Sequence, residues 1–146
     1  MSDPRLGGLR NLLVKIGLNF LANKKKLADL SGPQFVNLLY RLFNAMDHSV
    51  QSVGRTSDQG GDLIINKSQQ RVVALAKSYT TTAMGISAIQ EAVTAQKYYG
   101  YSQAMIVTCS DFTKEATELA KVNNVELIGA KQLKDWLLKY LKESWS

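Results

Sequence analysis

Short apolar runs and longer stretches of helical periodicity alternate along the chain. Runs of strand length occur at five places: 49–53, 62–66, 71–76, 103–108 and 125–128. Apolar residues recur at helical spacing over four stretches: 9–22, 33–46, 86–99 and 130–141. Ser110 or Asp111 is expected to cap a further helix. Three consecutive strands predict a meander, and the later alternation predicts parallel crossovers, so we expect an α/β fold with a mixed sheet of about five strands flanked by helices on both faces.

The two strands at 62–66 and 71–76 carry the candidate chemistry. The first opens with Asp62, and Lys77 follows the second. In an antiparallel hairpin the start of one strand lies beside the end of the next, so these two side chains can meet at one edge of the sheet. A carboxylate can hold a divalent cation and a lysine can orient a phosphate, which is the minimum set for metal-assisted phosphodiester hydrolysis. The alternative is an ordinary hairpin with a surface Asp–Lys pair.

Charge and cysteine content narrow the function classes. A net charge of +6 and an isoelectric point near 9.5 favour a polyanionic partner, nucleic acid first. The lone cysteine, Cys109, excludes an intramolecular disulfide and a Cys-cluster zinc site, and its apolar surroundings predict a buried, inert thiol. A reducing, cytoplasmic location fits this composition. Nucleotide hydrolysis is not expected, because the chain has no Walker-type phosphate loop.

Residues 1–29 are expected to form an N-terminal amphipathic helix and a basic turn ahead of the domain at 30–146. The helix at 9–22 is too short and too charged to span a membrane, and no signal-peptide cleavage site follows cleanly. We expect it to pack on the domain, and a membrane is not the expected partner. Packing on a second subunit and lying at a membrane surface stay open as alternatives.

Six stretches carry a joint pattern in a fixed order: LSGPQFVNLLYRLF (30–43), DQGGDLII (58–65), VVALAKSY (72–79), GISAIQEAVTAQKYYG (85–100), MIVTCSDFTKEATELAK (105–121) and VELIGAKQL (125–133). Together they resemble the Mrr-like type IV restriction endonuclease domain of the PD-(D/E)xK nuclease superfamily. The resemblance implies a restriction-endonuclease-like fold and a DNA-cleaving endonuclease that depends on Mg²⁺ or Mn²⁺.

The resemblance also implies where the site lies. In the family, the Asp of a GGxD-like segment binds metal, and a (D/E/Q)xK strand supplies a second ligand and a lysine. These positions correspond to Asp62 and to Leu75-Ala76-Lys77, with the Ala76 backbone carbonyl as a further metal ligand. Two positions depart from the family pattern: Leu75 stands where Gln or an acid is expected, and Val36 stands where the first helix often carries Glu.

Other residues are expected to complete the site. Gln90 and Glu91, on the helix after the second strand, are the expected substitutes for the missing ligand; the alternative for Glu91 is a solvated helix residue. The segment at 54–61 is expected to be a polar, glycine-rich loop that approaches the DNA backbone closely. The expected DNA contacts are Arg55, Gly60, Gly61, Ser78 and Thr80.

Partners and rival functions follow from the same residues. Cutting both strands commonly needs two active sites, which favours a homodimer, and specificity is expected to lie with a separate recognition domain or subunit, or to be absent. Because Leu75 cannot bind Mg²⁺, the alternative function is a catalytically lapsed module that binds DNA or other partners. Three tyrosines cluster near a helix end, where core or rim packing is expected more than base stacking: Tyr98, Tyr99 and Tyr101.

Overall fold

A computed structural model describes residues 7–8, 11, 25–57, 60–78 and 82–146. Its centre is a five-stranded sheet in the order β1-β2-β3-β4-β5. The strands are Ser49–Ser57 (β1), Gly60–Lys67 (β2), Gln70–Lys77 (β3), Gln103–Thr108 (β4) and Val125–Ile128 (β5). The first three pair antiparallel, and β3–β4 and β4–β5 pair parallel. The mixed sheet predicted from the sequence is confirmed.

Four helices cover the sheet: Gly32–Ala45 (α2), Ile86–Tyr99 (α3), Lys114–Val122 (α4) and Ala130–Leu141 (α5). Local chemistry fixes their ends. Ser31 caps α2 in a reciprocal capping box with Gln34, and Pro33 lies in the first turn. Gly100 ends α3 with φ of 71°, a left-handed conformation that glycine adopts without strain.

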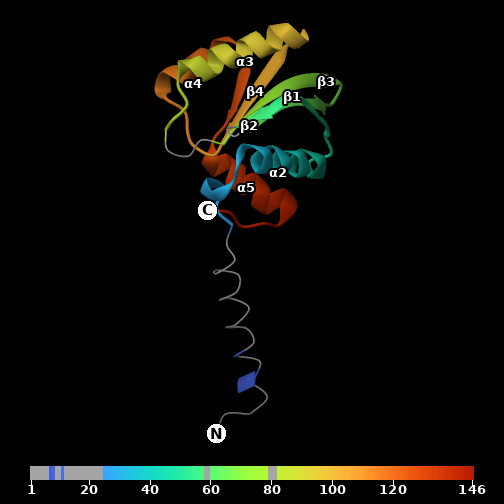
Figure 1. Ribbon diagram of the computed structural model, residues 1–146, viewed down its shortest axis with the longest axis vertical. Coiled ribbons are helices and arrows are strands. Elements are labelled where there is room, and N and C mark those ends of the chain that lie inside the picture. Colours follow the sequence, from blue (N-terminus) through green and yellow to red (C-terminus); the bar gives the residue numbers. More distant parts are fainter. Residues whose placement is uncertain (1–6, 9–10, 12–24, 58–59, 79–81) are drawn as a thin grey trace.

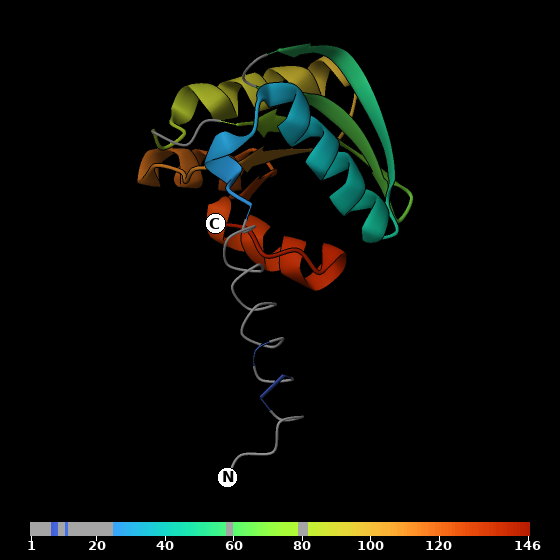
Figure 2. The ribbon, with the colours of Figure 1, turned by 60° about the horizontal axis from the view of Figure 1, so that its bottom comes forward.

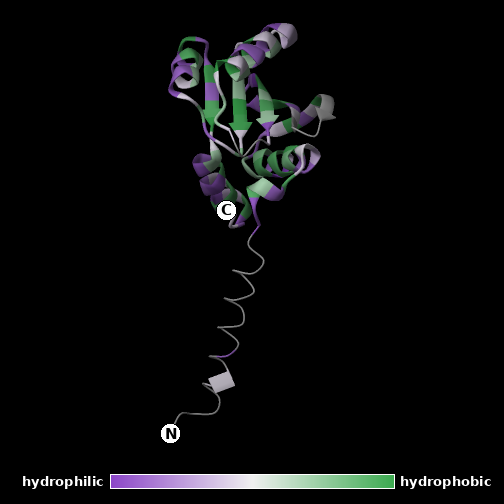
Figure 3. Cartoon of the chain, turned by 60° about the vertical axis from the view of Figure 1, so that its left-hand side comes forward, coloured by the Kyte–Doolittle hydropathy of each residue, from purple (hydrophilic) through white to green (hydrophobic). Residues whose placement is uncertain are grey.

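The two faces of the sheet bury separate cores. Figure 1 shows α2 and α5 on one face and α3 and α4 on the other, with the predominantly apolar strands between them in Figure 3. Along β3, Val72, Ala74 and Ala76 pack with the α2–α5 core, whereas Val73 and Leu75 pack with the α3–α4 core. A strand covered on both faces reads as a continuous apolar run, which is why β3 shows no polar alternation.

The predicted loop at 54–61 is mostly strand. Pairing continues past an irregularity between Val53 and Ser57, and Ser57 pairs with Gly60. Backbone hydrogen bonds can extend a hairpin where the side chains are not apolar. The prediction from the apolar residues therefore ended the strands too early. The expectation of a long glycine-rich loop was therefore wrong.

The predicted cap of α4 was also wrong. Thr113, not Ser110 or Asp111, caps the helix, and its side chain accepts a hydrogen bond from the Ala116 N–H. The Ser110 hydroxyl instead donates to the Thr82 carbonyl at 2.8 Å, and the Asp111 carbonyl accepts from the Met84 N–H at 2.7 Å. These contacts fix the segment that leads into α3, and tertiary pairing of this kind has no local sequence signal.

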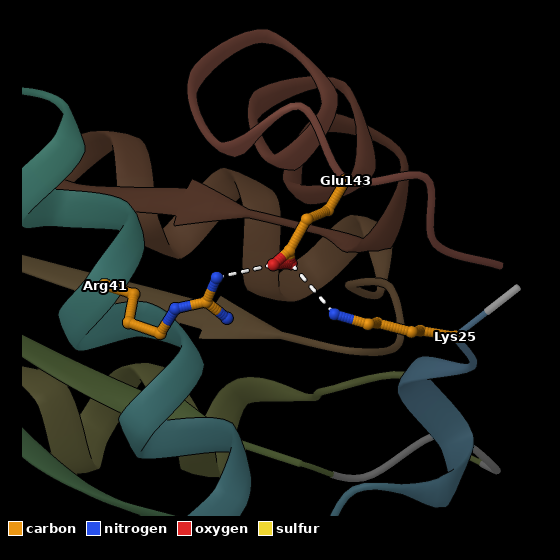
Figure 4. Close-up of polar contacts among 3 residues, drawn as sticks. All are labelled: Lys25, Arg41 and Glu143. Carbon is orange, nitrogen blue, oxygen red and sulfur yellow. Dashed lines mark hydrogen bonds and ion pairs between the residues drawn. The ribbon is translucent and has the colours of Figure 1, made fainter. Parts of the chain in front are cut away.

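The C-terminal tail holds the start of the domain. Glu143 lies between Arg41 of α2 and Lys25 and binds both side chains (Figure 4). The Ser146 N–H donates to the Lys25 carbonyl, and the Leu27 N–H donates to the Ser146 carbonyl, each at 2.9 Å, so the C-terminus lies beside the segment that leads into α2 (Figure 2). Leu27 is buried in the α2–α5 core.

The predicted helix at 9–22 lies outside the described residues, apart from Asn11, which is helical. Among the residues that the structure describes, no helix has the length and apolar content needed to cross a membrane.

Candidate functional site

Three side chains from three elements meet at one end of the sheet. Asp62 in β2 pairs with Leu75 in β3, and Lys77 lies two residues beyond Leu75. Side chains alternate along a strand, so Asp62 and Lys77 project from the same face, which is the face that α3 covers. Glu91, in the second turn of α3, reaches Lys77, whose Nζ lies 2.8 and 2.9 Å from the two carboxylate oxygens. The folded hairpin and one helix thus assemble two acids and a lysine.

The surroundings of Asp62 disfavour the ionised form of its carboxyl group. Burial raises the pKa of the Asp62 carboxyl, and the negative charge of Glu91 raises it further, while Lys77 opposes both effects. Two carboxylates share a single ammonium group here. Lys77 itself is only 19% exposed, whereas Glu91 is 54% exposed. A local excess of negative charge around one lysine is an arrangement that an added cation would stabilise.

Leu75 lies directly opposite Asp62 and two residues before Lys77 on this face. Its side chain is 1% exposed and belongs to the core with Ile89 and Ala92 of α3. The position where the family pattern has Gln or an acid is therefore a core position in this chain, and it offers no ligand. The Lys77 carbonyl accepts from the Cys109 N–H beside β4. Because successive carbonyls alternate in direction, the Ala76 carbonyl lies on the β2 side of the strand, where Ala76 pairs with Gly61, the residue before Asp62.

Two cavities flank the Lys77–Glu91 pair. The hydroxyl-side cavity, of about 300 Å³, is lined by Lys77, Thr82, Ala83, Met84, Gly85, Ser87, Ala88 and Glu91. The tyrosine-side cavity, of about 490 Å³, is lined by Asp62, Glu91, Thr94, Ala95, Tyr98 and Tyr99. Glu91 lines both cavities. Asp62, Lys77 and Glu91, together called the acid–lysine centre, therefore lie between a cavity with hydroxyl groups and a cavity with tyrosines.

The structure separates the two candidate residues on α3. Glu91 contacts Lys77, whereas Gln90 is exposed. Adjacent helical residues point about 100° apart, and Gln90 lies on the side of α3 opposite the buried Ile89 and Ala92. Val36, the other departure from the family pattern, is buried in the α2–α5 core on the opposite face of the sheet. Of these two α3 residues, Glu91 is the one that lies at Lys77.

Of the residues expected to contact DNA, the two glycines and Ser78 lie at this end of the hairpin. Gly60 pairs with Lys77 and Gly61 pairs with Ala76. Ser78 follows Lys77 directly and is half-buried, and Arg55 belongs to β1. Thr80 lies outside the described residues.

Sequence reasoning missed Ser87 and Thr94, which line the two cavities, and expected core or rim packing for Tyr98. Ser87, Thr94 and Tyr98 all lie on the Glu91 side of α3, at spacings of three, four or seven residues from it. That spacing was visible in the sequence, since residues three, four and seven apart share a helix face. Thr82 enters through the connection to Ser110 and has no comparable signal.

The donor set fits a hard divalent cation. Its oxygens are the Asp62 and Glu91 carboxylates and the Ala76 carbonyl, and oxygen ligands are those that Mg²⁺ and Mn²⁺ prefer. Within the described ranges, no group of three or more acidic, histidine or cysteine side chains gathers as a metal cluster. The chain thus offers two carboxylates, and a bound cation would keep several waters, as Mg²⁺ usually does.

Comparison with solved structures supports the same fold. A crystal structure of the protein of unknown function AF1548 has a TM-score of 0.53 and 16% identity, covering 73% of this chain and 59% of that chain. The MspJI restriction endonuclease in complex with a 27-mer oligonucleotide has a TM-score of 0.50 and 15% identity, covering 75% and 27%. The chain therefore spans 59% and 27% of the lengths of these two structures, and at such identities they show a shared fold.

No curated protein matches the sequence. The family model of the Mrr catalytic domain, described as a restriction endonuclease, matches residues 27–137. The matched range includes the whole sheet and all four helices that cover it, apart from the last four residues of α5. The chain belongs to the Mrr catalytic-domain family of restriction endonucleases.

Proposed function

We propose that this domain is an endodeoxyribonuclease that hydrolyses DNA phosphodiester bonds with Mg²⁺ or Mn²⁺. The observation that carries the proposal is the convergence of Asp62, Lys77 and Glu91 from β2, β3 and α3 at one end of the sheet. Membership of a restriction endonuclease family and the net charge of +6 support DNA as the substrate.

Each residue of the centre has a distinct task. Asp62 and Glu91 would hold the cation together with the Ala76 carbonyl. When bound, the cation supplies Lewis-acid stabilisation of the phosphate and activation of the attacking water. Lys77 faces the phosphate and stabilises the charge that develops on it. Its ammonium has three donors, and Glu91 accepts at two oxygens, so a donor remains for the substrate.

The hydroxyl-side cavity supports phosphate binding beside this centre. It combines Lys77 with the hydroxyl-bearing Thr82 and Ser87, and side chains of these types commonly contact DNA phosphates. Arg55, Gly60, Gly61, Ser78 and Thr80 remain the proposed DNA contacts. We expect DNA affinity to fall steeply from low to physiological salt, because each phosphate contact releases condensed counterions. An association constant that does not change with salt would contradict phosphate-driven binding.

The decisive experiment is cleavage of supercoiled and linear DNA, including modified DNA, with Mg²⁺ or Mn²⁺. We expect Asp62→Asn, Lys77→Ala and Glu91→Gln each to abolish cleavage while the circular dichroism spectrum stays native. Glu118→Gln and Lys121→Ala, at exposed positions on α4, are matched charge controls and should cleave as the wild type does. Wild-type protein that cleaves none of these substrates with any divalent metal would refute the nuclease function.

One observation favours a second candidate, a catalytically lapsed domain that binds DNA without cutting it. Leu75 fills the ligand position of the family pattern with a buried apolar side chain. This candidate predicts DNA binding that does not need metal and no cleavage by the wild type. A gain of cleavage in Leu75→Gln would then identify the missing ligand as the cause.

A further inference from the structure

The tyrosine-side cavity opens beside Asp62 and has no task in the hydrolysis described above. Tyr98 and Tyr99, in the last turn of α3, line it together with Asp62 and Glu91. Tyr98 follows Glu91 by seven residues, which is about 10 Å along the helix axis. A substrate phosphate held at the acid–lysine centre therefore places a neighbouring nucleotide within reach of the two tyrosines.

Tyr98 is the outer member of an ordered aromatic cluster. The residue is 81% exposed, the highest value for any large hydrophobic residue in the part of the chain that the structure describes. It meets the Tyr99 ring edge-on, with centroids 5.0 Å apart and planes at 90°. Tyr99 in turn stacks on Tyr101 at 5.9 Å, and both pack against the α3–α4 core. Tyr98 thus contacts an ordered neighbour while most of its surface stays open to solvent.

Exposure alone would not assign a function, because single exposed aromatic residues are common on protein surfaces. The position of this one is the additional observation. Tyr99 lies close enough to Asp62 for the carboxylate charge to raise the pKa of the phenol, after the larger effect of burial. Tyr98 and Tyr99 also line the same cavity as Asp62 and Glu91, so the tyrosines and the proposed catalytic acids border one hollow.

An aromatic face of this kind selects the form of the DNA. Bases inside a duplex are already stacked on one another, so a side chain can stack only on a base that is unpaired or turned out of the helix. The acid–lysine centre would hold the phosphate and Tyr98 the base of the same strand. Each stacked base contributes about 1–3 kcal/mol and has little sequence preference, because every base has a π-face.

We propose that Tyr98 and Tyr99 form a base-stacking site beside the cleavage centre, and that the preferred substrate is DNA with an unstacked base next to the bond that is cut. This inference rests on the proposed nuclease function for its substrate, but its binding step can be measured without cleavage. It predicts that the domain prefers forked or single-stranded DNA over a fully paired duplex.

The test uses the full chain carrying Asp62→Asn, so that no cleavage occurs, and oligonucleotides that contain the fluorescent base 2-aminopurine. We expect the base to be quenched in a single-stranded or forked oligonucleotide and unchanged in a blunt duplex. Tyr98→Ala should weaken binding of the single strand by roughly 5- to 150-fold and abolish the quenching. Tyr98→Phe keeps the ring and should retain both.

Tyr40→Ala is the matched control, because Tyr40 is another exposed tyrosine and lies on α2, on the other face of the sheet. It should bind the single strand as the parent does. The proposal is overturned if Tyr98→Ala binds the single strand as tightly as the parent, or if it loses single-strand and duplex binding equally. If quenching depends on Tyr98 but the wild type cleaves no DNA, the nuclease function alone is refuted. If the wild type cleaves DNA and cleavage depends neither on Tyr98 nor on strand pairing, the stacking site alone is refuted.

Discussion

Replacing Leu75 by glutamine tests whether the family's ligand position is still part of the site. The Leu75 side chain is 1% exposed and lies opposite Asp62 in the sheet. Glutamine keeps the first two carbons and loses two buried methyl groups, at about 0.8 kcal/mol each. Burying the amide costs about 1–3 kcal/mol, and a hydrogen bond to the Asp62 carboxylate offsets a similar amount. We therefore expect Leu75→Gln to destabilise the metal-free domain by roughly 1–3 kcal/mol.

Leu75→Met is the matched control, because it conserves volume and should cost less than about 1.5 kcal/mol. A domain of ordinary stability, about 5–15 kcal/mol, stays folded in both variants. The assay is chemical denaturation with and without Mg²⁺ or Mn²⁺, together with plasmid cleavage. If the amide oxygen joins the metal ligands, the metal should stabilise Leu75→Gln more than wild type, by about 1.4 kcal/mol for each tenfold gain in affinity. An equal metal response in the glutamine and methionine variants would show that position 75 does not touch the cation.

Three further predictions concern titratable groups. The folded state raises the pKa of Asp62, so the ionised carboxylate destabilises the metal-free domain at neutral pH. At neutral pH, Asp62→Asn should therefore unfold at a higher denaturant concentration than wild type. This difference should shrink as the pH falls toward the ordinary carboxyl pKa of 3.8. Burial alone would raise the pKa of Glu143, but the hydrogen bond and charge of Arg41 lower it overall. The stabilisation of the fold by the Glu143 carboxylate is therefore present above pH 4.5 and lost on further acidification. Glu143→Gln should lower the free energy of unfolding by about 1 kcal/mol at neutral pH, and by less in high salt. Burial raises the pKa of Cys109 to about 12, so the native thiol should resist alkylation at neutral pH and react only on unfolding; rapid native labelling would contradict its burial.

Much of the fold followed from the apolar pattern. The helix at 86–99, the strands at 103–108 and 125–128 and the helix at 130–141 occur at the predicted residues. These elements are buried on one face or on both, so their patterns report the core directly. The errors arose where polar backbone pairing or tertiary contacts decide structure, as in the extension of β1 through Gly54–Ser57 and the capping of α4 by Thr113. Neither choice leaves a hydrophobic signal.

The candidate site was predictable only in part, for a related reason. The start of one strand of a hairpin lies beside the end of the next, so Asp62 and Lys77 were expected to meet at one edge of the sheet. The choice between Gln90 and Glu91 depends on how α3 is rotated over the sheet, which Ile89 and Ala92 set by packing on β3 and β4. That rotation is a tertiary property. It also carries Tyr98 to the Asp62 side, whereas the sequence analysis expected core or rim packing for this residue more than base stacking.

The packing of Leu75 and the pairing of Lys77 with Glu91 both depend on the position of α3 over the sheet. A lysine only 19% exposed needs a nearby anion, and an apolar residue at position 75 cannot provide one. In this chain the anion comes from α3, so the acid, the lysine and the tyrosines all depend on how that helix sits on the sheet. Leu75 contributes to that seating through its contacts in the α3–α4 core. Leu75 therefore helps to position Glu91, so loss of packing at Leu75 should disturb the proposed catalytic centre even where none of the proposed ligands is changed.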